Sequence, residues 1–368
     1  MSEFKIPPIS TLLGSTLGNF FGAIRYGRVD PGYYHKVFLT SLICFIASPF
    51  HLWEKFKDRK LKKLDNPPIF IIGHWRSGTT FLHNLMCQDP DTGYVTTYQS
   101  VFPNNMYSKL LFKPFMRWKI PAKRPGDNIK LHVDYPQEDD FSLSNILPAF
   151  YQFFYFPDAY KALFEETVLF KNSSDKEINN WQDVYNKLII KARANTGGKN
   201  VIMKNPVNTA RVNKILKIYP KARFIHIYRN PVVVYLSTKK FFQELIPTLQ
   251  LQKTSPEQIQ NMIFDLYAML MRAYFDQRSL IPPSQLIEIS FESFEKDPMN
   301  YLADIYKQLD IGDWQQAAPH FEAYLRDMGG YKKNVYRISK EELVRIKEEW
   351  SFTFDELGYE VPEGLEIV

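Results

Sequence analysis

A glycine-containing segment at residues 73–82, with the sequence GHWRSGTTFL, is the part of the chain best suited to bind an anion. It follows a short apolar run at 69–72 and leads into a segment with helical periodicity at 79–87. Backbone N–H groups at such a turn, together with the positive end of the following helix dipole, form a site for a phosphate-like anion. We therefore expect a strand, an anion-binding loop and a helix in that order.

The cation of this loop stands in an unusual place. Gly73 and Gly78 fit the frame of the ATP-binding loop GxxxxGK[ST], but the lysine position holds Thr79 and the basic residue is Arg76. In ATP and GTP hydrolysis that lysine reaches the β- and γ-phosphates while Ser or Thr holds Mg²⁺. The pattern favours a donor with one 5′-phosphate and a transferable group. A kinase that uses Mg-ATP is the alternative.

Two further segments place polar residues after expected strands. Residues 222–231, ARFIHIYRNP, predict a strand that runs into a loop at Arg229. Ser237 follows about two helical turns later, close enough for both side chains to converge on one phosphate. Residues 201–206, VIMKNP, place Lys204 after another expected strand.

These segments together resemble the sulfotransferases that use 3′-phosphoadenosine 5′-phosphosulfate (PAPS). Residues 73–82 look like the 5′-phosphosulfate loop of that family, in which Lys or Arg is followed by Ser-Gly-Thr-Thr. Arg229 and Ser237 are similar to its 3′-phosphate site. The resemblance covers about residues 67–300 and is nearest to bacterial members with Arg in the first loop, followed by the tyrosylprotein sulfotransferases. It implies transfer of the sulfuryl group from PAPS to an acceptor hydroxyl.

The resemblance also implies individual roles. Lys204 would stabilise the sulfuryl group beside Arg76, because the stretch from Lys204 to Ser237 resembles that of the tyrosylprotein enzymes. Phe81 matches a position where the cytosolic enzymes place a ring against adenine, with a core position as the simpler alternative. Lys332 and Lys333 could close over the 3′-phosphate, with plain surface lysines as the simpler alternative. PAPS is the expected co-substrate, and no metal is expected. The predicted donor-binding residues are Arg76, Ser77, Gly78, Thr79, Thr80, Phe81, Arg229, Ser237, Lys332 and Lys333.

A general base must take the proton of the acceptor hydroxyl, and two candidates compete. Residues 95–100, VTTYQS, lack the glutamate of the tyrosylprotein pattern. Residues 136–141, PQEDDF, look like the Pro-x-Glu-Asp-Glu element of the bacterial members, which favours Glu138 over the two aspartates after it. His132 is the rival, because the histidine base of the cytosolic enzymes lies about this far beyond the first loop. The same carboxylates would also suit a helix N-terminus.

The elements that must position these residues predict an α/β fold. Apolar runs at 69–72, 201–203, 223–227 and 286–289 are typical of buried parallel strands, and segments with helical periodicity follow several of them. The alternation predicts a P-loop-like three-layer fold with a central parallel sheet flanked by helices, and the resemblance makes it the sulfotransferase type.

The chain is expected to divide near residue 65. Residues 1–64 predict an N-terminal apolar and basic helical segment, associated with a membrane or covering the substrate site. Residues 65–368 predict the sulfotransferase domain, with an aromatic-rich insertion at about 101–171 that shapes a substrate cavity. The first thirty-six residues lack the apolar stretch of a secretory signal, so we expect a cytoplasmic protein.

The run at residues 37–53 is apolar but interrupted, and lysines flank it. A spanning helix needs about 20 apolar residues, so a buried helix or an interfacial helix at the inner membrane face is favoured over a span.

The composition of the chain limits the classes of partner and acceptor that we expect. The chain has 46 Lys and Arg against 40 Asp and Glu, a mild excess that does not indicate a nucleic-acid-binding stripe. Residues 150–157, FYQFFYFP, are apolar on nearly every face, which indicates core packing or the lining of an apolar cavity. With residues 37–53, this run favours a small lipophilic alcohol, such as a sterol, a phenol or a membrane lipid, as acceptor. Carbohydrate and protein tyrosine are the alternative acceptors, and a non-enzymatic membrane-associated binding protein is the alternative class.

Overall fold

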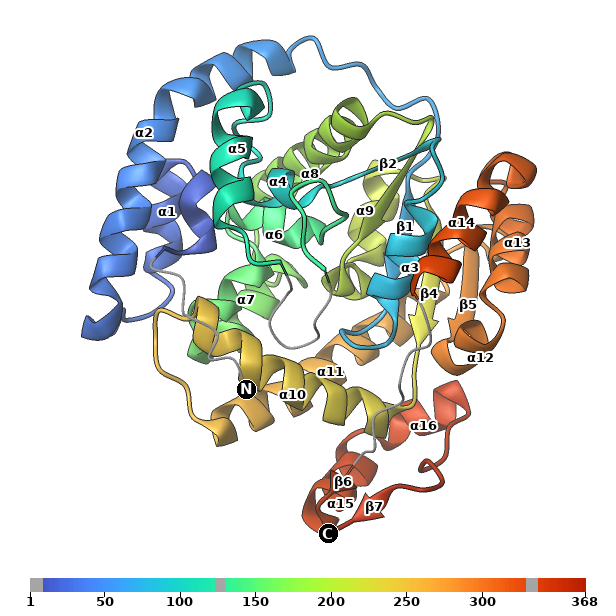
Figure 1. Cartoon of the computed structure of the whole chain (residues 1–368). Helices are drawn as coiled ribbons and strands as arrows, with labels where there is room; N and C mark the ends of the chain where they lie inside the picture. The colour runs from blue at the N-terminus through green and yellow to red at the C-terminus, as the bar shows by residue number, and fades with distance from the viewer. Residues whose placement is uncertain (1–8, 123–129, 329–336) are drawn as a thin grey trace. The chain divides into compact units, whose positions relative to one another are not determined.

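The computed structural model describes residues 9–122, 130–328 and 337–368 of the chain (Figure 1). Contacts between residues divide the chain into two compact units, each made of three stretches of sequence. The first unit comprises Met1–Asp65, Gly93–Gly197 and Phe241–Ile259, and the second comprises Asn66–Thr92, Gly198–Lys240 and Gln260–Val368. The division into residues 1–64 and 65–368, with an insertion at about 101–171, stays a prediction.

A parallel β-sheet organises the second unit and confirms the predicted fold class. Its strands are β1 (Ile69–Ile72), β3 (Asn200–Lys204), β4 (Arg223–Tyr228) and β5 (Leu286–Ser290). The sheet order is β2-β3-β1-β4-β5, in which β2 (Thr92–Tyr94) is the outer strand and contains the boundary between the units. β1 pairs in parallel with β3 and β4, and β4 with β5. β1 and β3 are buried along their whole length, which explains their continuous apolar sequences.

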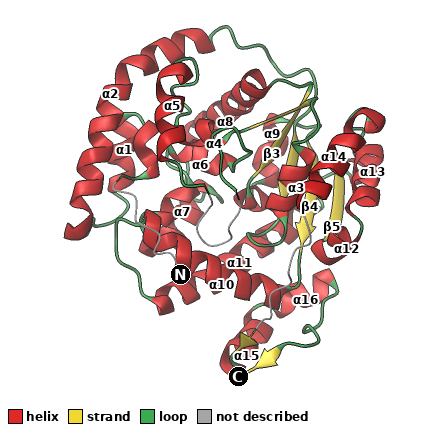
Figure 2. Ribbon diagram, viewed as in Figure 1, coloured by secondary structure: helices red, strands yellow, loops and turns green. Residues whose placement is uncertain are grey.

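Helices of the second unit lie beside this sheet, as Figure 2 shows with helices in red and strands in yellow. A hydrophobic cluster joins residues of the strands to α3, α13 and α14. The elements are α3 (Thr79–Met86), η5 (Pro206–Ala210), α9 (Val212–Ile218), η6 (Pro283–Gln285), α12 (Phe291–Lys296), α13 (Pro298–Leu309), α14 (Trp314–Met328), β6 (Arg337–Ile338), α15 (Lys340–Glu349), α16 (Ser351–Leu357) and β7 (Glu366–Ile367). Two helices, α10 (Pro231–Leu249) and α11 (Pro256–Arg278), contain boundaries between the units.

The first unit is built from helices. They are η1 (Thr11–Gly14), α1 (Leu17–Ile24), η2 (Pro31–Tyr33), α2 (Tyr34–Asp58), α4 (Thr97–Val101), α5 (Lys109–Lys119), α6 (Asp139–Ser144), η3 (Phe150–Phe154), η4 (Pro157–Ala159), α7 (Tyr160–Thr167) and α8 (Asp175–Thr196). The aromatic run of η3 is buried: the rings of Phe150 and Phe153 stack 4.7 Å apart, and Phe164 meets Phe150 edge-on. These rings therefore form part of the core of this unit.

Candidate functional site

Two glycines shape the loop that follows β1. Gly73 has φ +137°, and a Cβ there would lie 2.1 Å from the carbonyl oxygen of Ile227 on β4. Gly78 has φ +97°, and a Cβ there would lie 2.1 Å from the ring of Phe291. Side chains rarely adopt this backbone conformation, and neither position has room for one. The glycine spacing seen in the sequence is thus required by the close approach of β4 and α12.

Hydrogen bonds to neighbouring elements fix the same loop. The Gly73 N–H donates to Thr209 Oγ1 of η5 at 2.7 Å. The buried Ser77 hydroxyl donates to the His74 carbonyl oxygen at 2.7 Å, and the Ile227 carbonyl oxygen lies 2.9 Å from it. The helix α3 begins directly after Gly78, and the first N–H groups of a helix have no partner within it. The structure thus has the strand, loop and helix in the order predicted from the sequence, and anion binding by this loop stays a prediction.

Three residues predicted to bind the donor contact one another in the second unit. Arg76 adopts the left-handed conformation with φ 67°, and its Nε donates to Ser237 Oγ at 2.9 Å. Arg229 Nη1 donates to the Arg76 carbonyl oxygen at 3.4 Å, and its guanidinium lies 4.5 Å from the centre of the Phe291 ring. The sequence assigned Arg76 to the 5′ end of the donor and Ser237 to its 3′-phosphate. In the structure the two side chains are joined by a hydrogen bond.

Lys204 lies at the same edge of the sheet, because it ends β3 and pairs in register with Ile71 of β1. Its side chain is 2% exposed, and its Nζ lies 3.5 Å from Thr80 Oγ1 at the start of α3. Burial lowers the pKa of His83 well below its ordinary value, and the positive charge of Lys204 lowers that pKa further. Lys204 therefore supplies positive charge to the start of α3, while the histidine beside it stays neutral.

The cluster fits a donor that carries phosphate groups. Arg229 Nε is buried and has no hydrogen-bond partner among the described residues. A buried donor left without an acceptor costs about 1–3 kcal/mol, so an anionic oxygen at this place would remove an existing penalty. A small hollow adjoins the loop and is lined by Ser77, Tyr228 and Arg229 among others. Within the described ranges, no group of three or more His, Cys, Asp or Glu side chains could hold a metal ion.

Two further predicted donor residues, Thr79 and Phe81, have different surroundings. Thr79 is buried at the start of α3. Phe81 packs against the hydrophobic cluster, with its ring centre 5.5 Å from that of Phe294. This is the core contact expected as the simpler alternative, and a role against adenine stays a prediction. Lys332 and Lys333 lie outside the described residues.

The candidate bases belong to the first unit, and the structure separates the three adjacent carboxylates by their contacts. Asp139 is fully buried and accepts a hydrogen bond from the Tyr185 hydroxyl at 2.6 Å. Asp140, 1% exposed, accepts from the Tyr151 N–H at 2.7 Å. Glu138 is half-buried at the N-cap position of α6, without a side-chain capping bond. The two aspartates therefore have structural partners within this unit.

The rival base, His132, lies in a turn of the same unit. Its side chain is 43% exposed, and its Nδ1 accepts from the Asp134 N–H at 3.3 Å. The ring of Tyr135 lies 5.4 Å away, centre to centre. These contacts are those of a surface histidine held by its own turn. Neither base assignment is tested by them, and both stay predictions.

A comparison with models of protein families shows the family to which this chain belongs. A model described as the sulfotransferase family matches residues 67–316, which contain the whole loop, Lys204, Arg229 and Ser237. The chain belongs to the sulfotransferase family. Over 331 residues it is 30% identical to omega-hydroxy-beta-dihydromenaquinone-9 sulfotransferase Stf3 of Mycobacterium bovis, with 89% of this chain and 85% of that protein covered. The protein of the same name from Mycobacterium tuberculosis matches equally.

Solved structures agree on the fold of this sulfotransferase. The sulfotransferase STF1 from Mycobacterium tuberculosis H37Rv matches with a TM-score of 0.64 and 16% identity over 91% of both chains. STF9 from Mycobacterium avium matches with a TM-score of 0.68 and 15% identity over 98% of this chain and 99% of that one. At such identities the likeness shows the fold alone. The prediction of a PAPS-dependent sulfotransferase with a parallel α/β fold is confirmed.

Two residues that the sequence analysis did not single out, Phe291 and Glu292, contact the predicted donor-binding segments. Phe291, directly after β5, packs against Gly78 and Arg229. Glu292 accepts from the Asn230 N–H at 3.2 Å and from the Tyr359 hydroxyl at 2.6 Å, which fixes the backbone next to Arg229. Their position after the predicted strand at 286–289 could have identified Phe291 and Glu292, because loops that follow parallel strands gather at one edge of the sheet.

Proposed function

We propose that this sulfotransferase moves the sulfuryl group of PAPS to the hydroxyl group of a small lipophilic acceptor, with a membrane lipid as the preferred class. The cluster of Arg76, Arg229, Ser237 and Lys204 at one edge of the sheet carries the donor half of the proposal. The acceptor half is supported by the relative at 30% identity, whose name states a hydroxylated menaquinone as its substrate. Carbohydrate and protein tyrosine rank below it, because nothing in the described contacts favours them.

Each donor residue has a distinct part in this proposal. Arg229 and Ser237 would hold the 3′-phosphate, and the N–H groups at the start of α3 would hold the 5′ end together with Arg76. The donor supplies a sulfuryl group on a phosphate leaving group. The bond from the acceptor oxygen to sulfur forms while the bond from sulfur to the 5′-phosphate oxygen breaks. Lys204 and Arg76 would stabilise the negative charge on the transferred group and the leaving oxygen.

Glu138 is the proposed general base, and the acceptor proton passes to its carboxylate as the oxygen attacks. The choice rests on the resemblance of residues 136–141 to the Pro-x-Glu-Asp-Glu element of the bacterial members. His132 remains the second candidate. We further propose a cytoplasmic location with peripheral contact to the inner membrane face, where a lipid acceptor would be met.

The donor site is tested by thermal shift with 3′-phosphoadenosine 5′-phosphate, 5′-AMP and Mg-ATP. A ligand at 100 times its dissociation constant adds about 2.7 kcal/mol to the free energy of unfolding, so the bisphosphate should give a clear shift. Arg229→Ala should reduce the advantage of the bisphosphate over 5′-AMP, because only the former has a 3′-phosphate. Arg326→Ala, at an exposed arginine of α14 in the same unit, is the matched control and should leave it intact.

The acceptor class is tested by sulfate transfer from labelled PAPS to a panel of hydroxylated quinones, sterols, phenols, sugars and tyrosine peptides. Transfer to lipophilic alcohols well above transfer to sugars and peptides is the expected result. Preference for Mg-ATP in the shift assay, or transfer only to sugars or peptides, would contradict the donor or the acceptor half respectively.

A further inference from the structure

In α2, the longest helix of the first unit, the inward face is mostly polar and the outward face is rich in large apolar residues. A helix on the surface of a water-soluble domain normally directs its apolar stripe to the core and its polar residues to solvent. In α2 the buried residues are mostly polar: Lys36, Thr40, Cys44, Ala47, His51 and Glu54. Eight large apolar or aromatic residues of α2 are exposed, beside the polar His35 and Lys55: Tyr34, Phe38, Leu42, Phe45, Ile46, Leu52, Trp53 and Phe56. The buried residues recur every three or four residues and therefore lie on one face of the helix, and the exposed residues lie at the positions between them.

The polar face of α2 is fixed to the rest of the first unit. Lys36 Nζ donates to the Thr248 carbonyl oxygen at 3.1 Å. Lys191 of α8 forms a buried ion pair with Glu54, and its Nζ lies 3.4 Å from Asp58 Oδ1. Separating a buried ion pair leaves uncompensated charge and is strongly unfavourable. The helix is long and apolar enough to cross a membrane by length and composition, over 31–58. The hydrogen bond of Lys36 and the ion pair of Glu54 instead attach the polar face of α2 to other elements of the first unit.

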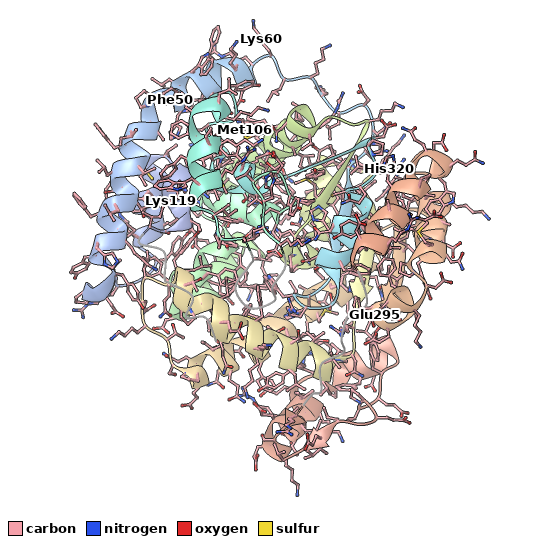
Figure 3. All side chains as sticks on the ribbon, viewed as in Figure 1. Phe50, Lys60, Met106, Lys119, Glu295 and His320 are labelled. Atoms are coloured by element: carbon pink, nitrogen blue, oxygen red, sulfur yellow. The ribbon has the colours of Figure 1, made fainter. Side chains whose placement is uncertain are left out.

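The exposed apolar surface continues onto α5. Phe50 of α2 meets Phe112 of α5 edge-on at 5.4 Å, and the Tyr107 N–H donates to Glu54 Oε2 at 3.0 Å. The two helices lie side by side in Figure 1, and Figure 3 labels Phe50 on α2 and Lys119 on α5. The exposed apolar side chains of α5 are Leu110 (86%), Leu111 (62%), Phe115 (37%) and Trp118 (74%). We call these four residues, with the eight exposed residues of α2, the α2–α5 surface.

Positive charge borders the α2–α5 surface. Residues 55–63 contain six basic residues, and α5 contains four more. On α2 the acidic residues are Glu54 and Asp58, both bound to Lys191, and α5 has none. Lys57 lies over the ring of Trp53 at 5.8 Å and Lys119 over that of Trp118 at 3.6 Å. Two of the basic residues of α5, Lys113 and Arg117, lie 2.5 Å and 3.9 Å from carboxylate oxygens of Asp134. Exposed apolar side chains, tryptophans and an excess of basic residues match the interfacial region of an anionic membrane.

We propose that the α2–α5 surface docks this enzyme onto an anionic lipid bilayer, with α2 lying in the interface and its apolar face among the acyl chains. The proposal deepens the proposed function, since it rests on an acceptor that resides in a membrane. It commits to the bilayer because an apolar outer face suits hydrocarbon, and the basic border suits anionic headgroups. An uncharged protein partner would explain only the first of these features.

Flotation of the full-length protein with lipid vesicles tests the proposal. We expect binding to phosphatidylcholine vesicles that contain phosphatidylglycerol, and weaker binding to phosphatidylcholine alone. The triple variant Phe38→Glu, Phe45→Glu, Leu52→Glu should lower the bound-to-free ratio about tenfold or more, because it places three charges among acyl chains. The matched control Leu280→Glu, Val344→Glu changes exposed apolar residues of the second unit and should bind like the original protein. Retained stabilisation by 3′-phosphoadenosine 5′-phosphate shows that each variant is folded.

Tryptophan quenching by brominated lipids places the contact on the surface itself. The exposed Trp53 and Trp118 should account for most of the quenching, so the double change to Phe should remove it. Trp181→Phe, at a tryptophan of the same unit that is 3% exposed, is the control and should leave quenching unchanged.

Four results would overturn the proposal. They are absence of vesicle binding, equal binding to neutral and anionic vesicles, a lipid-independent dimer that the triple variant abolishes, and retention on membranes after alkaline carbonate washing. The third would mean that a second copy covers the surface, and the fourth that α2 spans the bilayer. None of them bears on the nucleotide shift assay, so failure of the docking surface and failure of the sulfotransferase assignment are separate outcomes.

Discussion

The donor loop of the second unit and the acidic segment of the first unit place charged side chains in different ways. Arg76 and Arg229 follow parallel strands and Lys204 ends one, and the order of those strands brings them to one edge of the sheet. In the acidic segment, residues 138–140, neighbouring carboxylates have different partners: Asp139 accepts a hydrogen bond from a tyrosine hydroxyl, and Asp140 accepts one from a backbone N–H. A site at strand ends can thus be predicted from local sequence, whereas the roles of adjacent carboxylates are decided by partners far away in the chain.

The largest expected effect tests the acidic segment. Glu138→Gln keeps the size of the side chain and removes its basicity, so kcat should fall by about 10²–10⁴ if Glu138 is the base. Binding of 3′-phosphoadenosine 5′-phosphate should be unchanged, because the donor residues are elsewhere. Steady-state kinetics with a lipophilic acceptor, together with nucleotide thermal shifts, measure both quantities.

Asp139→Asn is the matched control for that substitution. It changes the hydrogen bond from Tyr185 at a fully buried position, so it should lower the free energy of unfolding by about 1–3 kcal/mol. The kcat of the folded enzyme should be little altered. Survival of activity in Glu138→Gln together with its loss in His132→Ala would transfer the role of base to the histidine.

Lys204→Met tests the donor side with the next largest effect. Methionine fills the buried volume of the lysine stem without its charge, so kcat should fall by about 10²–10³ while nucleotide affinity changes less. The matched control is Lys199→Met, near the other end of β3, where the lysine is 76% exposed and paired with Asp91. A loss confined to nucleotide affinity would make Lys204 a binding residue and leave Arg76 as the cation of the transfer step.

Gly78→Ala tests whether the loop is fixed by backbone geometry. The residue has φ +97° and faces the Phe291 ring, so alanine should lower the free energy of unfolding by about 1–3 kcal/mol and weaken nucleotide binding. Gly22→Ala in α1 is the control: nothing lies within 4 Å of its Cβ position, and alanine should stabilise that helix slightly. Equal, small effects from both changes, measured by urea unfolding, would show that the loop tolerates a side chain.

The same contrast explains how much of the molecule the sequence could predict. The strands β1, β3 and β4 were evident from apolar runs because they are buried on both faces along most of their length, whereas β5 is largely half-buried. The donor residues were predicted from glycine spacing and strand ends. The contact between Arg76 and Ser237 was not evident, because it depends on where α10 leaves β4 relative to the loop after β1. Phe291 carries no motif, and its role comes from strand β5 pairing beside β4.

Composition alone did not predict which face of α2 packs inward. Counting apolar residues in 37–53 did not separate a buried helix from an interfacial one. The three- and four-residue spacing of Lys36, Thr40, Cys44, Ala47, His51 and Glu54 does separate them once those residues are known to face inward. Which face packs inward is set by partners such as Lys191, 137 residues away in sequence from Glu54.

Lys36 gives the smallest expected effect and tests that inward polar face. Burial lowers the pKa of Lys36 to about 8, whereas an unfolded chain keeps lysine near about 10.4. Between these values the unfolded chain binds more protons than the folded one, so this residue makes the free energy of unfolding rise with pH, by at most about 1.4 kcal/mol per pH unit. Lys36→Met should remove that contribution, so it should raise the free energy of unfolding most near pH 7 and less toward pH 10.

Urea unfolding at several pH values measures this change in the free energy of unfolding, with exposed Lys55→Met of the same helix as control. A parallel pH dependence in both variants would mean that the lysine reaches water, and that the polar face of α2 is less firmly packed than its contacts with Thr248 indicate.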